Sequence, residues 1–254
     1  KNKRYIIIMY FPFISINDFE GWTTLNNFPP NNWEIKSPVN SYISCTWVEN
    51  NNWKSKTLKE ISPFQSITIN KSDINNYESI KSLIVLSLSK KELPENSSTL
   101  PMPVIQETSL PVWRASVGLS SANSSSSYQG EIMPFPPKAS LLSFAPFVQI
   151  SKEIENYLIF LNLEKVPNIR ESEICISDTA HPNKIRKFSK IKNNFKNTIS
   201  LDDCNFQENE IPLISCKDMT GLPIYVSINK NNKSISIEHS HPGASFVVHG
   251  ERWK

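Results

Sequence analysis

The chain has 254 residues, of which 39% are hydrophobic, so it is long enough to bury a substantial core. Its 27 Lys and Arg residues exceed its 24 Asp and Glu residues by three, an excess too small to indicate binding to nucleic acid or to an anionic membrane. No apolar run approaches the roughly 20 residues of a membrane-spanning helix, so we expect no transmembrane segment. We favour a cytoplasmic location, and the sequence predicts no oligomeric state.

Short runs rich in β-branched and aromatic residues recur along the chain, separated by Asn, Ser and Pro. This punctuation is typical of β architecture, and we expect strands at 5–11, 42–48, 66–70, 83–88, 113–119, 128–132, 141–150, 157–163, 174–177, 213–216, 224–228, 234–239 and 246–249. The predicted fold is mainly β: an antiparallel β-sandwich or distorted β-barrel with one or two short helices. We expect residues 1–254 to form a single domain, and an internal boundary would fall near 94–105, where the chain is rich in Pro.

Local signals refine this picture. The serine tract at 120–127 is expected to join its two flanking strands into a hairpin, and turns at 230–233 and 241–243 to join the last three strands into an antiparallel meander. A short helix is expected at 72–81, with Ser72 as its N-cap. Near-helical apolar spacing also occurs in the basic stretch 184–196, interpreted as the solvated face of an amphipathic element or as a contact for phosphate, sulfate or an acidic partner.

Two features of composition bear on the fold. Asn, Lys, Ile and Ser are abundant, whereas Gly occurs only six times. The chain has four widely spaced cysteines with no Cys-x-x-Cys pair, a pattern that predicts free, buried thiols rather than a disulfide framework: Cys45, Cys175, Cys204 and Cys216.

The most concentrated chemistry lies in the C-terminal run 235–251, which holds three of the four histidines. In an extended chain, alternation places Ile235, Ile237, His239 and His241 on one face, so the two imidazoles continue an apolar, inward stripe. Such a pair suits a metal site or an acid/base pair, with His249 nearby as a ligand-binding candidate. The alternative is that the histidines are structural, with their polar atoms satisfied in the core.

The His239-Ser-His241 spacing resembles the first metal-binding motif of the cupins, in which two imidazoles point into a β-barrel. If a metal is present, two imidazole ligands and a carboxylate would suit zinc or ferrous iron with open coordination positions and would support Lewis-acid or oxygen chemistry. The carboxylate of the cupin motif is missing here, because Ala244 and Ser245 occupy its place. A third ligand would have to come from an earlier residue such as His181 or Glu131.

A second group of residues flanks the serine tract. If the two strands pair, Arg114 comes close to Tyr128, Gln129 and Glu131. We interpret the group either as an ion pair with an aromatic cap, or as a polar pocket in which Arg114, Tyr128 and Gln129 hold a ligand and Glu131 acts as a base.

Six tryptophans form the third feature: Trp22, Trp33, Trp47, Trp53, Trp113 and Trp253. Several lie near Asn-rich segments, and an exposed indole beside Asn side chains is a typical way to bind a pyranose. Core packing is the alternative. We assign Trp47 to the core and regard Trp22, Trp33 and Trp53 as ligand-binding candidates.

Three functions therefore stay open. The preferred one is a binding protein for a small polar molecule or carbohydrate, with a His-lined concave site. The second is a metal-assisted enzyme, a cupin-like hydrolase, isomerase or oxygenase, that uses His239 and His241 as catalytic or metal-binding groups together with Glu131. The third is a structural or assembly protein whose exposed aromatic residues contact other proteins.

Overall fold

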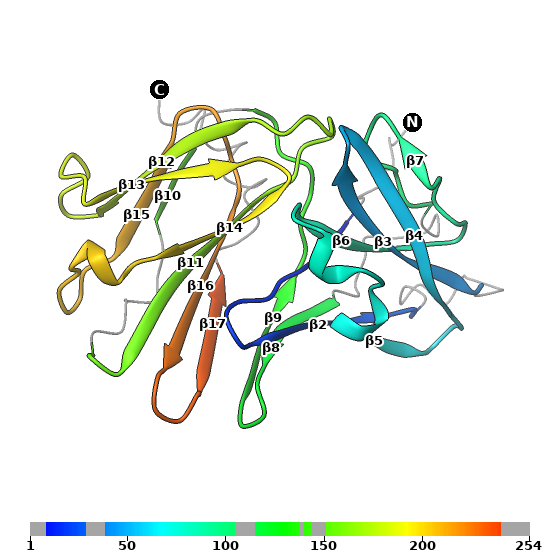
Figure 1. Ribbon diagram of the computed structural model, residues 1–254, viewed down its shortest axis with the longest axis horizontal. Helices are drawn as coiled ribbons and strands as arrows, with labels where there is room; N and C mark the ends of the chain where they lie inside the picture. The colour runs from blue at the N-terminus through cyan, green and yellow to red at the C-terminus, as the bar shows by residue number, and fades with distance from the viewer. Residues whose placement is uncertain (1–8, 29–38, 105–114, 138–139, 144–150, 240–254) are drawn as a thin grey trace, which may run out of the picture.

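The computed structural model describes residues 9–28, 39–104, 115–137, 140–143 and 151–239. The fold is mainly β, as predicted, and it consists of four open antiparallel sheets (Figure 1). Each sheet ends in two edge strands, so sandwich-like packing describes the fold and a closed barrel does not.

The first half of the chain forms two of the sheets. One has the order β1 (Phe11–Phe13), β6 (Ile84–Ser89), β3 (Ser41–Glu49), β4 (Asn52–Ile61) and β7 (Asn96–Ser97). The other has the order β5 (Ser66–Asn70), β2 (Glu20–Asn26), β8 (Ala115–Ser120) and β9 (Ser125–Gly130). We call this second sheet the polar sheet, for the side chains on its outer face.

The second half of the chain forms the other two sheets. One has the order β10 (Ser140–Ser143), β15 (Pro212–Cys216), β12 (Glu171–Asp178) and β13 (Lys187–Lys192). The other, which we call the central sheet, has the order β14 (Phe195–Ser200), β11 (Ile154–Asn162), β16 (Leu222–Asn229) and β17 (Ile235–His239).

The two middle strands of the central sheet, β11 and β16, are buried on both faces over most of their length. Along β11, Leu158 and Phe160 belong to a core cluster within the second half of the chain. The alternate residues Ile159 and Leu161 belong to a larger cluster that also contains Val117 and other residues of the first half. Because successive side chains of a strand point to opposite faces, a stretch buried on both sides is expected to be apolar at every position, as residues 158–161 are.

The two halves also meet along the strands β9 and β17. The backbone N–H of Ile237 donates to Ser126 Oγ at 3.2 Å, and Ser124 Oγ donates to the carbonyl of Lys233 at 2.8 Å. β17 therefore lies beside β9 and brings the polar sheet next to the central one.

Asparagine replaces glycine in the turns. None of the described glycines has a positive φ, whereas most of the described residues that do are asparagines: Asn17, Asn50, Asn51, Asn76, Asn194, Asn205 and Asn209. Asn50 and Asn51, with φ of 50° and 56°, form the two-residue turn between β3 and β4. Asn tolerates the left-handed conformation better than other side-chain-bearing residues, so a chain poor in Gly can still form tight hairpins.

Several local predictions are confirmed. The serine tract does join a hairpin, in which β8 pairs with β9, and β16 pairs with β17 as the first half of the predicted meander. All four cysteines are free, as predicted, and three of them are buried; Cys175 is only half-buried, which differs from the prediction. No helix in the described part of the chain has the length and apolar character needed to cross a lipid bilayer.

Other local predictions differ from the structure. The segment 72–81 forms two 3-10 turns, η1 (Lys71–Asp73) and η2 (Tyr77–Ser79), instead of one helix. The basic stretch 184–196 is a β-hairpin that turns at Asn193 and Asn194. Strands β2, β4 and β7 were not predicted at all, and neither were β13 and β14, the two strands of this hairpin. The predicted strand at 246–249 lies outside the described residues.

Candidate functional site

The outer face of the polar sheet carries hydroxyl and amide side chains from all four of its strands. Alternation separates them from an inner set that includes Leu25, Ile69, Val117 and Leu119, which are buried in the core. The outward residues are Glu20, Trp22, Thr24, Asn26, Ser66, Thr68, Asn70, Ser116, Gly118, Ser120, Ser125, Ser127 and Gln129. The described strand residues of this face therefore include one aromatic side chain, one carboxylate and no basic group.

Trp22 occupies the middle of this face. Its Cα partner in β8 is Gly118, and a Cβ atom built on that glycine would lie 2.3 Å from both Cε2 and Cζ2 of the indole. The indole ring therefore rests directly against the backbone of β8, in space that any side chain at position 118 would occupy. Trp22 is half-buried. The ring contacts the sheet, and part of the residue stays exposed to solvent.

Polar groups flank the ring in register. Asn70 pairs with Trp22 on one side, and Ser127 pairs with Gly118 on the other. In the next row, Thr24 Oγ1 and Thr68 Oγ1 share a hydrogen bond of 2.7 Å. Because neighbouring strands lie about 4.8 Å apart, these rows present donors and acceptors at regular spacing on a flat surface. The arrangement can bind a planar or ring-shaped polar molecule by stacking and by hydrogen bonds.

The inner face of the same sheet holds the aromatic group next to the histidines. The rings of Tyr128 and His239 lie 4.6 Å apart between centroids, tilted by 39°. The Tyr128 hydroxyl is buried and makes no hydrogen bond with any described residue. Burial raises the pKa of Tyr128, so the phenol stays neutral. A Cβ at Gly130 would lie 2.5 Å from Val117 Cγ2, so only glycine fits beside this ring.

The structure separates residues that the sequence placed in one pocket. Tyr128 points inward to His239, whereas Gln129 points outward to the face of Trp22. Glu131 follows directly after β9 and is half-buried. Arg114, Trp33, His241 and His249 lie outside the described residues. His239 does continue the stripe of Ile235 and Ile237, as alternation predicted.

Trp53 differs from the other ligand-binding candidates in its surroundings. It is completely buried, and its indole N–H donates to the carbonyl of Lys165 at 2.9 Å. Trp53 is therefore a core residue. Both sides of its ring are covered, so a ligand cannot reach it from solvent.

Potential metal ligands do not cluster in the described part of the chain, where no group of three or more His, Cys, Asp or Glu side chains could hold an ion. His181, the alternative third ligand, lies in the loop after β12 with Nδ1 3.1 Å from Asp178 Oδ1. The metal prediction for His239 and His241 depends on a residue outside the described ranges and stays a prediction.

A separate charged cluster around Asp178 links loops within the second half of the chain. Arg186 contacts the buried Asp178 carboxylate at 2.8 Å and forms two hydrogen bonds with Glu210, at 2.7 and 2.5 Å. Burial alone would raise the pKa of Asp178, but hydrogen bonds from the His181 backbone N–H and from Arg186 outweigh it and hold the pKa below its usual range. The cluster is fully paired, so its role is to stabilise the loops.

The comparisons leave the chain without a family. No protein-family model matches it, and no curated protein shows significant sequence similarity to it. A function for this chain can therefore be proposed only from the geometry and chemistry of its own site.

The sequence identified Trp22 and Gln129 as ligand-binding candidates, but it did not identify the residues that lie between them on the face of the sheet. Gly118, Ser116 and Ser127 carry no chemical motif, and only the register of β2, β8 and β9 brings them beside the indole. One signal was present: residues 20–26 alternate Glu, Trp, Thr and Asn with Gly, Thr and Leu, the period of a strand that is exposed on one face.

Proposed function

We propose that this chain is a carbohydrate-binding protein and that the sugar stacks on the indole of Trp22. One observation carries the proposal: a half-buried tryptophan lies against Gly118 in the middle of a sheet face whose other side chains are almost all hydroxyls and amides. The apolar C–H face of a pyranose matches an indole ring, and its hydroxyl groups match Ser, Thr, Asn and Gln side chains.

The shape of the site favours a particular kind of ligand. The face is a sheet surface with several rows of polar groups, so it suits one side of a glycan chain better than an enclosed small molecule. Among the described residues of its four strands, the face carries one carboxylate, Glu20, and no basic side chain, so the ligand we expect is a neutral polysaccharide or oligosaccharide. Binding without chemical turnover is the activity that these groups support.

Affinity gel electrophoresis against a panel of neutral polysaccharides tests the proposal. Migration of the wild-type protein should be retarded by at least one of them, and Trp22→Ala should remove most of the retardation, with roughly a tenfold loss of affinity. Trp47→Ala is the matched control, because Trp47 is also half-buried but lies in β3 of another sheet. Circular dichroism should show that both variants are folded.

Gly118→Ala is the sharper variant, because it keeps the tryptophan and changes only its position. The added methyl group would displace the indole from the backbone of β8. We expect Gly118→Ala to weaken binding about as much as Trp22→Ala does. Equal retardation of the wild-type protein and both variants would reject the Trp22 face as the site.

A further inference from the structure

A serine, a lysine and a tyrosine from three distant parts of the chain meet where its two halves are in contact. Ser15 lies between β1 and β2, Tyr77 begins the 3-10 turn η2, and Lys196 belongs to β14. Lys196 Nζ lies 3.2 Å from Ser15 Oγ, and the Tyr77 hydroxyl lies 2.6 Å from the same Oγ atom. The Ser15 hydroxyl is therefore within hydrogen-bonding distance of an amine and of a phenol. We call these three residues the serine cluster.

The backbone around Ser15 is held on both sides. Its neighbours Ile14 and Ile16 are buried in the larger core cluster. Ile16 and Phe19 exchange backbone hydrogen bonds of 3.3 and 2.8 Å across a tight turn in which Asn17 has a φ of 48°. Ser15 itself is half-buried. Its hydroxyl thus has a fixed position and keeps some access to solvent.

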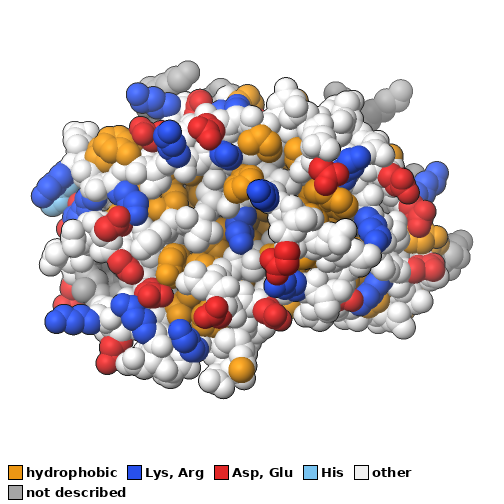
Figure 2. All heavy atoms as spheres, in the orientation of Figure 1, with side chains coloured by type: hydrophobic (Ala, Val, Ile, Leu, Met, Phe, Trp, Pro, Cys, Tyr) orange, Lys and Arg blue, Asp and Glu red, His pale blue; other side chains and the backbone are white. Residues whose placement is uncertain are grey.

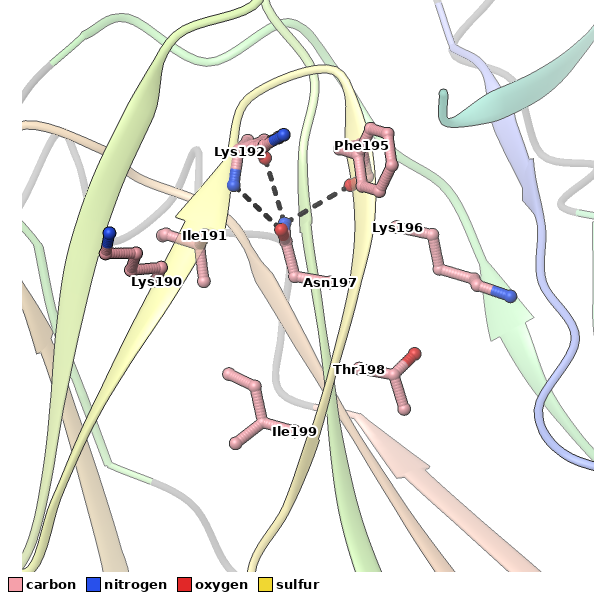
Figure 3. A pocket seen from close by; sticks show the side chains of 8 residues that line it. All are labelled: Lys190, Ile191, Lys192, Phe195, Lys196, Asn197, Thr198 and Ile199. Atoms are coloured by element: carbon pink, nitrogen blue, oxygen red, sulfur yellow. Dashed lines mark hydrogen bonds between the residues drawn. The ribbon is translucent and has the colours of Figure 1, made fainter. Parts of the chain in front are cut away.

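The central sheet directs Lys196 toward the first half of the chain. Lys196 pairs with Leu161, which belongs to the core cluster shared with the first half, and paired residues of neighbouring strands point to the same face. In Figure 3 the Lys196 side chain points away from the other residues that line the pocket of this hairpin, toward the N-terminal segment. Asn197 fixes the turn beside it, because its side chain accepts from the Lys192 N–H at 2.7 Å and donates to the Lys192 carbonyl at 2.9 Å.

The surroundings of Lys196 favour the neutral amine more than water does. Burial lowers the pKa of Lys196, and the Glu78 carboxylate acts in the opposite direction. Glu78 is exposed and forms an ion pair with Lys71. Lys196 Nζ also donates to the backbone carbonyl of Ser15 at 2.7 Å. A neutral amine that donates to this carbonyl keeps its lone pair for the proton of the Ser15 hydroxyl.

Tyr77 completes the serine cluster with a ring that its neighbours hold. The ring packs edge-on against Phe13, with 5.5 Å between centroids and 74° between planes. Lys71 Nζ lies 5.5 Å from the centroid of the same ring. The Tyr77 hydroxyl can donate a hydrogen bond to an oxygen that gains negative charge beside Ser15 Oγ.

We propose that Ser15 is the nucleophile of an esterase activity, with Lys196 as its general base and Tyr77 as the donor that stabilises the oxyanion. Ser15 Oγ forms a bond to the carbonyl carbon of a carboxylic ester while Lys196 takes the hydroxyl proton. The C–O bond to the alcohol then breaks, and Lys196 returns the proton to the leaving alcohol. Water attacks the acyl-serine in the same way, which releases the carboxylic acid and restores Ser15.

Partial exposure limits the substrate. All three side chains are half-buried. Figure 2 shows basic, acidic and hydrophobic side chains next to one another on the face of the molecule between β14 and the 3-10 turns. A long or branched acyl group would be hindered at a half-buried hydroxyl, so we expect esters of short acids such as acetates. The activity is independent of sugar binding at Trp22, and either proposal can fail without the other.

A fluorophosphonate probe, which reacts with activated serines, tests the nucleophile on the full chain. Intact-mass and peptide mass spectrometry should find a single phosphonyl group, on Ser15, and none on Ser15→Ala. That variant keeps the backbone carbonyl to which Lys196 donates, so it should fold. Hydrolysis of p-nitrophenyl acetate should also fall at least about 100-fold in Ser15→Ala.

Lys196→Arg separates a general base from a structural contact. Arginine can donate to the same carbonyl but stays protonated, so it cannot take the Ser15 proton. We expect a folded variant, by circular dichroism, in which labelling and hydrolysis are about 100-fold slower. Tyr77→Phe should slow both at least about tenfold. Lys190→Met, an exposed lysine of β13, is the control that should change neither.

Three results would overturn the proposal. The first is no labelling of the wild-type protein. The second is labelling that persists in Ser15→Ala because another serine reacts. The third is a Lys196→Arg variant that reacts as fast as the wild-type protein, which would show that the lysine only holds the two halves together.

Discussion

The central sheet and the polar sheet have the same number of strands, but the central sheet contacts a core on both faces, whereas the polar sheet contacts a core on one face. Residues 157–161 of the central sheet are Tyr, Leu, Ile, Phe and Leu, because both faces of this strand contact a core. Residues 116–120 of the polar sheet are Ser, Val, Gly, Leu and Ser, because only one face does. A sheet covered on both sides has no surface left for a ligand, whereas a sheet covered on one side can vary its outer residues at little cost in stability.

Because of this difference in burial, we assign stability to the central sheet and ligand recognition to the polar sheet. The two core clusters both draw on the central sheet, so it connects the halves of the molecule. The polar sheet gives its inner residues to the larger cluster and presents Trp22 on its outer face. Substitutions in the central sheet should therefore lower stability, whereas substitutions on the outer face of the polar sheet should weaken ligand binding.

The largest effect is expected for Phe160→Ala in β11. Phe160 is completely buried, and its removal should lower the free energy of unfolding by about 3–5 kcal/mol. Its neighbour Ile159 is equally buried on the other face, so Ile159→Ala should cost about 2–5 kcal/mol. Urea denaturation followed by tryptophan fluorescence measures both. A cost under about 1 kcal/mol for either residue would show that its face of the sheet is not packed.

A matched pair in β8 should behave differently. Leu119→Ala removes a completely buried side chain and should cost about 2–5 kcal/mol. Ser116→Ala, on the exposed outer face, should change the free energy of unfolding by less than about 0.5 kcal/mol. The same denaturation experiment decides the outcome. Similar costs at both positions would remove the distinction between the two sheets.

The charged cluster around Asp178 predicts a pH dependence for the second half of the chain. Because the pKa of Asp178 is lowered in the folded state, its contribution is present at neutral pH and is lost as the pH falls from about 4 through the folded pKa. In Arg186→Met the carboxylate loses its ion pair but stays buried, so its pKa should rise. The variant should be less stable at neutral pH and should lose less stability on acidification than the wild-type protein.

Urea midpoints measured across the acid range for both proteins check this prediction. Parallel pH profiles for wild type and Arg186→Met would show that the ion pair does not set the acid sensitivity.

The smallest effect is expected in the turns. Asn50→Gly relieves the left-handed backbone of the β3–β4 turn and should raise the free energy of unfolding by a few tenths of a kcal/mol, whereas Asn50→Ala should lower it. Thermal unfolding of the three proteins gives the order. If alanine proves as stable as asparagine at this position, the turn does not require a positive φ.

Part of the fold could be predicted from sequence and part could not, for a physical reason. Strands with continuous or strictly alternating apolar residues, such as 157–163 and 224–228, were found. β2 was missed, because its outer residues are polar apart from Trp22. The basic stretch was predicted only as an amphipathic element and not as two strands, because Ile185, Phe188, Ile191 and Phe195 happen to lie at nearly helical spacing. They stand on both sides of a turn at two asparagines, where no glycine marks the break.

The candidate site shows the same limit. Trp22 could be singled out by its chemistry, but the role of Gly118 depends on the register between strands nearly a hundred residues apart. The separation of Tyr128 from Gln129 also needed the structure, because it depends on which face of the sheet is buried. The residue types were enough to identify candidate residues, but the pairing of the strands determines which of those residues share a surface.

The most direct test of the account is a ¹⁵N-indole spectrum of the protein titrated with the polysaccharide that retards it most. The chain has six tryptophans, and loss of one resonance in Trp22→Phe assigns the signal of interest. We predict that the Trp22 resonance shifts progressively with added glycan while the resonance of the buried Trp53 stays in place. A Trp22 resonance that does not move while the glycan binds would contradict the central claim.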